Sequence, residues 1–180
     1  MFVVGVNRVA IAVQQRAPTT PIVAVFLSDP VRSGVVKTLA RPGGNITGLS
    51  WDADPEIMGK NVQLLVELLP GASRVAGVWN PQDMSVVPYI PPLKNAAARL
   101  GVVLVEATAT RAADIENTLI QAKREGAAGI VVAPDALLYA ERRRVSEIAL
   151  RLQLPSVWGF REAVEAGGVL LLGWAVRLGA

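Results

Sequence analysis

Apolar runs that read as strands alternate along this chain with segments that have the apolar spacing of helices. This alternation is typical of βαβ units and of a mostly parallel sheet. Three of the apolar runs end in a polar residue, which places Asp29, Asn80 and Asp135 at the carboxyl ends of buried strands. Open α/β sheets bind small ligands outside those ends, so the pattern predicts ligand capture. The three segments are IVAVFLSDPV at 22–31, RVAGVWNP at 74–81 and AGIVVAPDAL at 128–137.

The composition excludes several classes of active site. The 180 residues include no histidine and no cysteine. A Ser-His-Asp triad, a histidine base, a thiol nucleophile and a zinc site with histidine or cysteine ligands are therefore excluded. Gly43-Gly44 and Gly59-Lys60 lack the spacing of nucleotide-binding loops. We predict no catalytic residue, no cofactor and no metal, and a protein that is not an enzyme.

Charge and hydropathy limit the classes of partner that the chain can have. Hydrophobic residues make up 52% of the chain and charged residues 18%, which is enough to fill a core. The only basic run, Arg142 to Arg144, is interpreted as the solvated face of a helix, so no nucleic-acid partner is expected. No apolar run reaches the ~18–20 residues of a membrane helix. Met1 to Val6 has no preceding basic stretch, so we read it as a buried strand and expect the true start to be missing.

Turn and cap residues divide the chain into expected elements. Pro42-Gly43 ends one helix, Asp54 and Pro55 begin another, and prolines 88, 91 and 92 delay a third until about Leu93. We expect helices over 9–15, 31–40, 54–69, 93–100, 112–125, 138–152 and 161–165, and strands over 2–6, 22–27, 45–51, 74–80, 102–107, 129–134, 155–160 and 167–175.

Each candidate ligand residue also has a purely structural interpretation. Asp29 and Asp135 precede predicted helices and could cap them, while Asn80 precedes a proline and could form a turn. Trp158 and Phe160 alternate on one strand, so they share a face that belongs either to the core or to the wall of a ligand site. The residues alone leave these alternatives open.

Three segments carry a resemblance to a known family. SDPVRSGVVKTLARPGGNITGLS at 28–50, WNP at 79–81 and GFREAVEAGGVLLLG at 159–173 resemble the substrate-binding proteins of ABC transporters of the tryptophan/tyrosine uptake type. Nearly the whole chain follows that family's order. The tail from Trp174 departs from it, as do the prolines at 88, 91 and 92, and relatives have about two further βα units and a signal sequence before Phe2.

The resemblance implies a two-lobed type I periplasmic-binding-protein fold of class α/β, with parallel sheets flanked by helices and an incomplete N-terminal lobe. Residues 1–46 would form the partial N-terminal lobe and 52–168 the C-terminal lobe. A crossing strand would lie at 47–51, and a second crossing strand with a divergent tail at 169–180. Such lobes close by a hinge over a small solute.

The resemblance also implies a function and a set of site residues. The protein would be the solute-binding component of an ABC uptake transporter, with a membrane permease as partner and a periplasmic or lipid-anchored location, although this chain shows no signal sequence. Its solute would be an aromatic or other amino acid. We expect Asp135 to hold the ammonium group and Ser33 and Thr47 to hold the anionic end. The other implied ligand-binding residues are Asp29, Asn80 and Phe160.

Two other functions stay open on the sequence alone. A doubly wound α/β enzyme could use Asp29 or Asp135 as an acid or base, and the sensor lobe of a transcription regulator has a comparable fold. Genes for a permease and an ATPase beside this one would favour transport over both.

Overall fold

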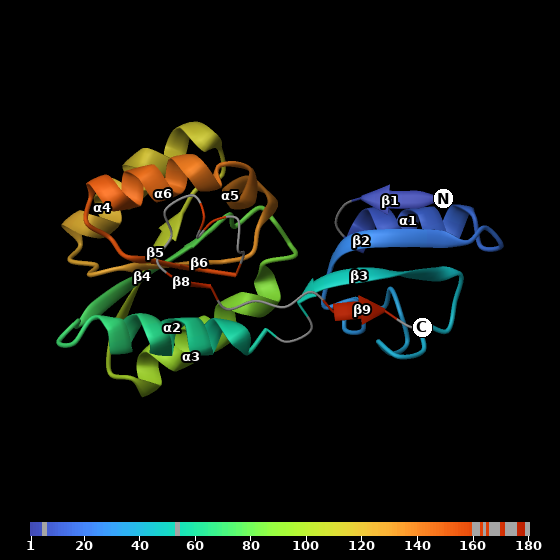
Figure 1. The fold of residues 1–180 in the computed structure, drawn as a ribbon, viewed down its shortest axis with the longest axis horizontal. Helices are drawn as coiled ribbons and strands as arrows, with labels where there is room; N and C mark the ends of the chain where they lie inside the picture. The colour runs from blue at the N-terminus through green and yellow to red at the C-terminus, as the bar shows by residue number, and fades with distance from the viewer. Residues whose placement is uncertain are drawn as a thin grey trace. The chain divides into compact units, whose positions relative to one another are not determined.

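The computed structural model describes residues 1–4, 7–52, 55–159, 163, 165, 170–171 and 176–178 (Figure 1). The chain divides into two compact units. Unit 1 consists of Met1–Pro55 with Trp174–Ala180, and unit 2 consists of Glu56–Gly173. The sequence-based lobe boundaries, with crossing strands at 47–51 and 169–180, remain a prediction.

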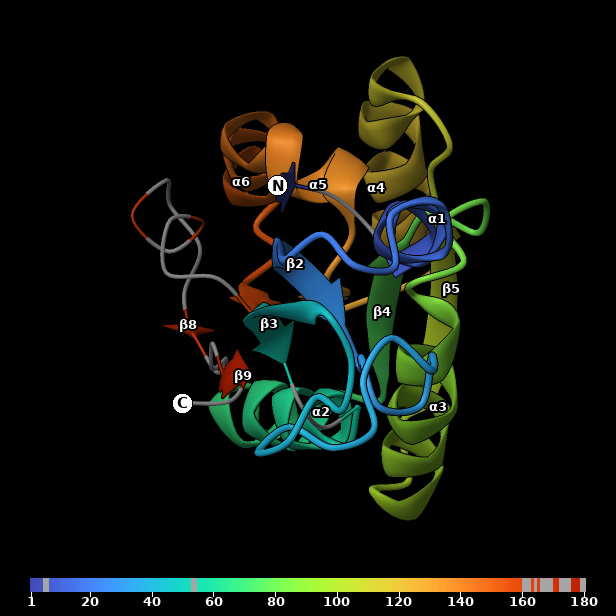
Figure 2. The same ribbon diagram turned by 90° about the vertical axis from the view of Figure 1, so that its right-hand side faces the viewer.

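Unit 1 is built on a four-stranded sheet in the order β1-β2-β3-β9. The first three strands are parallel, and β9 pairs with β3 in the antiparallel direction. Helix α1 lies on one face of this sheet (Figure 2), and Ala10 of that helix joins Ile22, Ala24 and Ile46 in the core. The elements are β1 (Phe2–Val4), α1 (Asn7–Arg16), β2 (Ile22–Ser28), β3 (Ile46–Asp52) and β9 (Val176–Leu178).

The helix expected over 31–40 does not form. The segment is a series of turns, closed by hydrogen bonds from Gly34 N to Val31 O and from Val36 N to Pro30 O. Gly34 has φ = 76°, which lies outside the right-handed helical region and ends any helix at this point. The apolar residues that suggested a helix still reach the core, because Val35 and Val36 pack there from the turns.

Unit 2 contains a five-stranded parallel sheet in the order β5-β4-β6-β7-β8. The strand β4 lies between β5 and β6, and every residue of β4 after Arg74 is buried. The described strands are β4 (Arg74–Trp79), β5 (Val103–Thr108), β6 (Ile130–Val132), β7 (Ser156–Trp158) and β8 (Leu170–Leu171).

Two layers of helices cover this sheet (Figure 1). Helices α2 and α3 lie on one face, and α4, α5 and α6 lie on the other. Pro91 and Pro92 fall in the first turn of α3, where a missing N–H costs little, so this helix begins earlier than the expected Leu93. The helices are α2 (Ile57–Leu68), η1 (Val87–Tyr89), α3 (Ile90–Arg99), η2 (Ala112–Asp114), α4 (Ile115–Arg124), α5 (Ala136–Ala140) and α6 (Arg142–Arg151).

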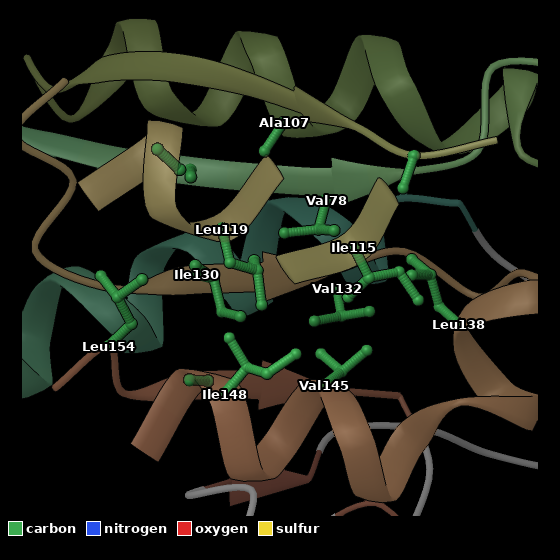
Figure 3. Packing of buried hydrophobic residues seen from close by; sticks show 14 of the residues in the cluster. Val78, Ala107, Ile115, Leu119, Ile130, Val132, Leu138, Val145, Ile148 and Leu154 are labelled. Atoms are coloured by element: carbon green, nitrogen blue, oxygen red, sulfur yellow. The ribbon is translucent and has the colours of Figure 1, made fainter. Parts of the chain in front are cut away.

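Separate hydrophobic clusters fill the two faces of the unit 2 sheet. In the cluster shown in Figure 3, Leu119 of α4 and Ile148 of α6 point toward Ile130 and Val132 of β6. The opposite cluster contains Leu65 of α2 and other side chains of α2, α3 and the sheet. Both units therefore confirm the predicted class, α/β with parallel strands and flanking helices. None of the helices in the described ranges has the length and apolar character to cross a membrane.

Candidate functional site

The strand order of unit 2 creates a topological switch point between β4 and β6. After β4 the chain passes through α3 to β5 on one side, and after β6 it passes through α5 and α6 to β7 on the other. The two connections leave the carboxyl edge in opposite directions, and such a switch point is where doubly wound sheets bind ligands. Asn80 follows β4 and Asp135 follows β6, so the structure brings two of the predicted residues to this point.

The Asp135 carboxylate joins the two loops of the switch point. Its Oδ2 accepts a hydrogen bond from the Asn80 backbone N–H at 2.7 Å. Its Oδ1 accepts one from the Leu138 backbone N–H, also at 2.7 Å, and so caps α5. The residue is fully buried, with 0% of its surface exposed. The capping role that the sequence offered for Asp135 is therefore observed, together with a second bond that the sequence did not indicate.

The electrostatic surroundings of Asp135 disfavour its charge. Burial raises the pKa of the Asp135 carboxyl above its usual value, and the nearby Asp83 carboxylate raises it further. The backbone N–H groups of Leu138 and Asn80 oppose this by stabilising the ionised form. Two acidic side chains, Asp135 and Asp83, thus lie close together at the carboxyl ends of β4 and β6.

Asn80 forms the turn that its position before Pro81 suggested. Its side-chain Oδ1 accepts a hydrogen bond from Gln82 N at 3.0 Å, and its backbone carbonyl accepts one from Asp83 N. The side chain is only partly buried. In the ranges that the structure describes, the Asn80 Nδ2 group has no acceptor, so it can donate to a ligand.

Unit 1 places Asp29 and Ser33 together at the carboxyl end of β2. Asp29 has φ = 38°, a conformation that residues other than glycine adopt rarely and that is often found at binding sites. The Ser33 hydroxyl donates to Asp29 O at 2.9 Å, and Arg32 N donates to Asp29 Oδ1 at 3.2 Å. Asn7, at the start of α1, donates through Nδ2 to Ser33 Oγ at 2.7 Å.

Thr47 does not share this end of unit 1. It lies opposite Val23, near the beginnings of the parallel strands β2 and β3. Six residues of extended strand separate that level from Asp29, which corresponds to roughly 20 Å. A single anionic group therefore cannot contact both Ser33 and Thr47 within unit 1, and the joint role expected for them is not supported by this placement.

The two aromatic residues of the strand expected over 155–160 have different outcomes. Trp158 is buried in the cluster that contains α4 and α6, and its Nε1–H donates to Ser156 Oγ at 3.0 Å. It is therefore a core residue, as one of the two sequence interpretations held. Phe160 lies outside the described residues, so its expected ligand contact stays a prediction.

Sequence reasoning missed two polar residues near the strand ends. Asn7 follows the short strand β1, and the pattern of apolar residues around it gave no sign of a contact with Ser33. Asp83 lies three residues after Asn80 and close to Asp135. The sequence did contain a signal for Asp83, because Asp83-Met84-Ser85 is a polar turn directly after a strand end.

A groove of about 310 Å³ lies elsewhere in unit 2, between β5 and α4. Its lining includes Glu106, Asn117 and Gln121 but neither Asn80 nor Asp135, so it is separate from the switch point. Among the described residues, no group of three acidic, histidine or cysteine side chains could hold a metal ion.

Comparison with known proteins identifies a family. Residues 2–176 match the model of the family described as ABC transporter substrate binding protein. A tyrosine-binding protein of Clostridioides difficile (strain R20291) is 24% identical over 154 residues, which are 85% of this chain and 43% of that protein.

Solved structures share the fold. A conserved domain protein from Vibrio cholerae O1 biovar eltor str. N16961 superposes with a TM-score of 0.76 at 32% identity, over 93% of this chain and 56% of that one. An ABC domain from Streptococcus pneumoniae in complex with L-Trp superposes with a TM-score of 0.74 at 22% identity, over 95% of this chain and 59% of that one. This chain thus spans about half the length of these relatives.

Proposed function

The chain belongs to the ABC transporter substrate-binding protein family, and we propose that it captures an amino acid at the carboxyl ends of β4 and β6 without altering it chemically. Members of this family are described as substrate-binding proteins. The Clostridioides difficile relative, which aligns with 85% of this chain, is named a tyrosine-binding protein. We further propose that the complete protein works outside the cytoplasm and delivers its solute to a membrane permease. Closure of two lobes over the solute remains a prediction from the family resemblance.

The observation that carries this proposal is the bond between Asn80 N and Asp135 Oδ2 at the switch point of unit 2. It joins the two loops that follow β4 and β6, while the Asn80 side chain is partly exposed beside it. An amino acid has an anionic and a cationic end. Asn80 Nδ2 is a suitable donor for the carboxylate, while the acidic residues gathered there suit the ammonium group.

The test is titration of the 180-residue chain with L-tyrosine, L-tryptophan and L-leucine, followed by calorimetry and by the unfolding temperature. A ligand present at a hundredfold excess over its Kd stabilises the folded state by about 2.7 kcal/mol. We expect such a shift with an aromatic amino acid and a loss of affinity of about tenfold in Asn80→Ala, because a hydrogen bond to a charged group is removed.

Glu125→Gln is the control for this experiment, because Glu125 is exposed and follows α4 at the opposite end of the strands. Its affinity and unfolding temperature should match those of the unchanged chain. Absence of binding to every amino acid tested, or chemical turnover of any of them, would overturn the proposal.

A further inference from the structure

Asp135 is a poor candidate for direct contact with a ligand's ammonium group. Both of its carboxylate oxygens already accept backbone hydrogen bonds, from Asn80 and from Leu138. Its surface is fully buried, so a ligand could reach it only after one of these bonds had broken. Breaking the bond from Leu138 would leave a buried N–H without an acceptor, which is costly, and breaking the bond from Asn80 would release the loop that follows β4.

Asp83 differs from Asp135 in each of these respects. It is partly exposed, and its Oδ1 accepts hydrogen bonds from Ser85 N at 2.9 Å and from Ser85 Oγ at 2.7 Å. In the described part of the chain, its Oδ2 receives no hydrogen bond and no lysine or arginine pairs with it. One oxygen therefore fixes the carboxylate in place, and the other is open to a cation.

A short chain of hydrogen bonds connects the two acids. Asp135 holds the backbone of Asn80, and the carbonyl of Asn80 accepts a bond from Asp83 N at 3.1 Å. Beyond Asp83, the turn continues through Val86 N, which donates to Asp83 O at 3.1 Å. Val86 and Tyr89 are buried and anchor the far end of the loop. The position of Asp83 thus depends on Asp135.

We propose that Asp83 is the carboxylate that binds the ligand's ammonium group and that Asp135 is a positioning residue that holds the Asn80–Asp83 turn in place. This assignment rests on the proposed function and reverses the role that the sequence suggested for Asp135. A cation beside Asp83 would also offset the mutual repulsion of the two neighbouring acids, which favours a ligand with a positive group.

The experiment compares L-tyrosine with 3-(4-hydroxyphenyl)propionate, which has the same ring and carboxylate but no amino group. Affinities of the 180-residue chain for both compounds give a ratio that isolates the ammonium contact. We expect the unchanged chain to prefer L-tyrosine by about tenfold to a hundredfold, the range of a hydrogen-bonded charge pair.

Two variants separate the roles. Asp83→Asn keeps an oxygen for Ser85 but loses the charge, so the ratio should fall toward one, and the unfolding temperature should not fall because the repulsion between the two acids is removed. Asp135→Asn should lower the affinity for both compounds by a similar factor, so that the ratio of the two affinities is kept. Amide hydrogen exchange at Asn80 and Leu138 should become faster. Glu125→Gln, which removes the same charge at a distance, should change neither quantity.

The outcomes distinguish the two levels of inference. A full preference for L-tyrosine in Asp83→Asn would overturn the assignment while leaving amino-acid capture intact, and a ratio lost only in Asp135→Asn would return the ammonium contact to Asp135. Failure of the unchanged chain to bind either compound, or L-tryptophan or L-leucine, would instead overturn the proposed function.

Discussion

Strands β2 and β4 are both apolar almost throughout, but the described structure covers them differently. In β4, residues on both faces are buried, because α2 and α3 lie on one side of the sheet and α4 and α6 on the other. In β2, Ile22 and Ala24 are buried beneath α1, whereas Val23 on the opposite face is 39% exposed. Leu49 of the neighbouring β3 is 44% exposed.

The comparison shows what an apolar run does and does not specify. A parallel sheet normally has both faces covered, and its strands are then apolar at every position. The run Ile22–Leu27 has that composition, but the described residues of unit 1 supply a hydrophobic cluster for one face only. The local sequence therefore specifies a strand, while the cover on each face depends on elements elsewhere in a chain.

The largest expected effect on stability is the contrast between two glycine-to-alanine substitutions, one destabilising and one not. A Cβ at Gly48 of β3, where φ is 153°, would overlap the backbone carbonyl oxygen of Ala24 in β2. We expect Gly48→Ala to destabilise unit 1 by about 3 kcal/mol or more, because neither backbone can move without breaking the sheet.

Gly59→Ala is the counterpart in unit 2. Gly59 is the third residue of α2, and a Cβ there would lie 3.5 Å from Ala96 Cβ, which is an ordinary contact. Alanine is favoured over glycine in a helix, so we expect Gly59→Ala to stabilise unit 2 by at most about 1 kcal/mol. Hydrogen exchange measured peptide by peptide reports each unit separately. Equal effects of the two substitutions would contradict the close approach of β3 to β2.

The second prediction compares two valines on strands. Val78 in β4 is 1% exposed and points into the cluster shown in Figure 3, whereas Val23 in β2 is 39% exposed. Val78→Ala should cost about 2 kcal/mol, from the lost transfer free energy and the cavity left behind. Val23→Ala should cost less than about 1 kcal/mol.

The same exchange measurement checks this pair, with each valine serving as the control for the other. If Val23→Ala proved as costly as Val78→Ala, an additional contact would have to cover the second face of β2. That result would remove the contrast between the two units.

The sequence predicted strand positions well because apolar runs bounded by turn residues are local signals. The expected strands at 22–27, 45–51 and 74–80 correspond to β2, β3 and β4. The helix expected over 31–40 was wrong, since apolar spacing alone did not reveal the backbone conformation at Gly34. The expected helix over 138–152 is replaced by α5 and α6, which meet at Glu141.

Prediction of the site was limited by strand order. The sequence placed Asn80 and Asp135 at strand ends, but it could not show that β4 and β6 are neighbours or that a carboxylate bridges them. The level of Thr47 in the sheet could not be read from the sequence either, because it follows from the pairing with Val23. Asn7 was missed because its contact with Ser33 joins residues far apart in the sequence.

The smallest expected effect is a pH dependence confined to unit 2. Because burial raises the pKa of Asp135 above its ordinary 3.8, the native state binds this proton more tightly than the unfolded state. The stability contributed by protonated Asp135 is therefore full below about pH 4 and is lost as the pH rises through the raised pKa. Asp135→Asn should remove that slope, so the difference in stability between the two chains should change as the pH rises above about pH 4. Exchange in peptides of unit 2 should report the change while those of unit 1 do not. A difference that is constant with pH would mean that the backbone N–H groups of Asn80 and Leu138 fully offset the burial of this carboxylate.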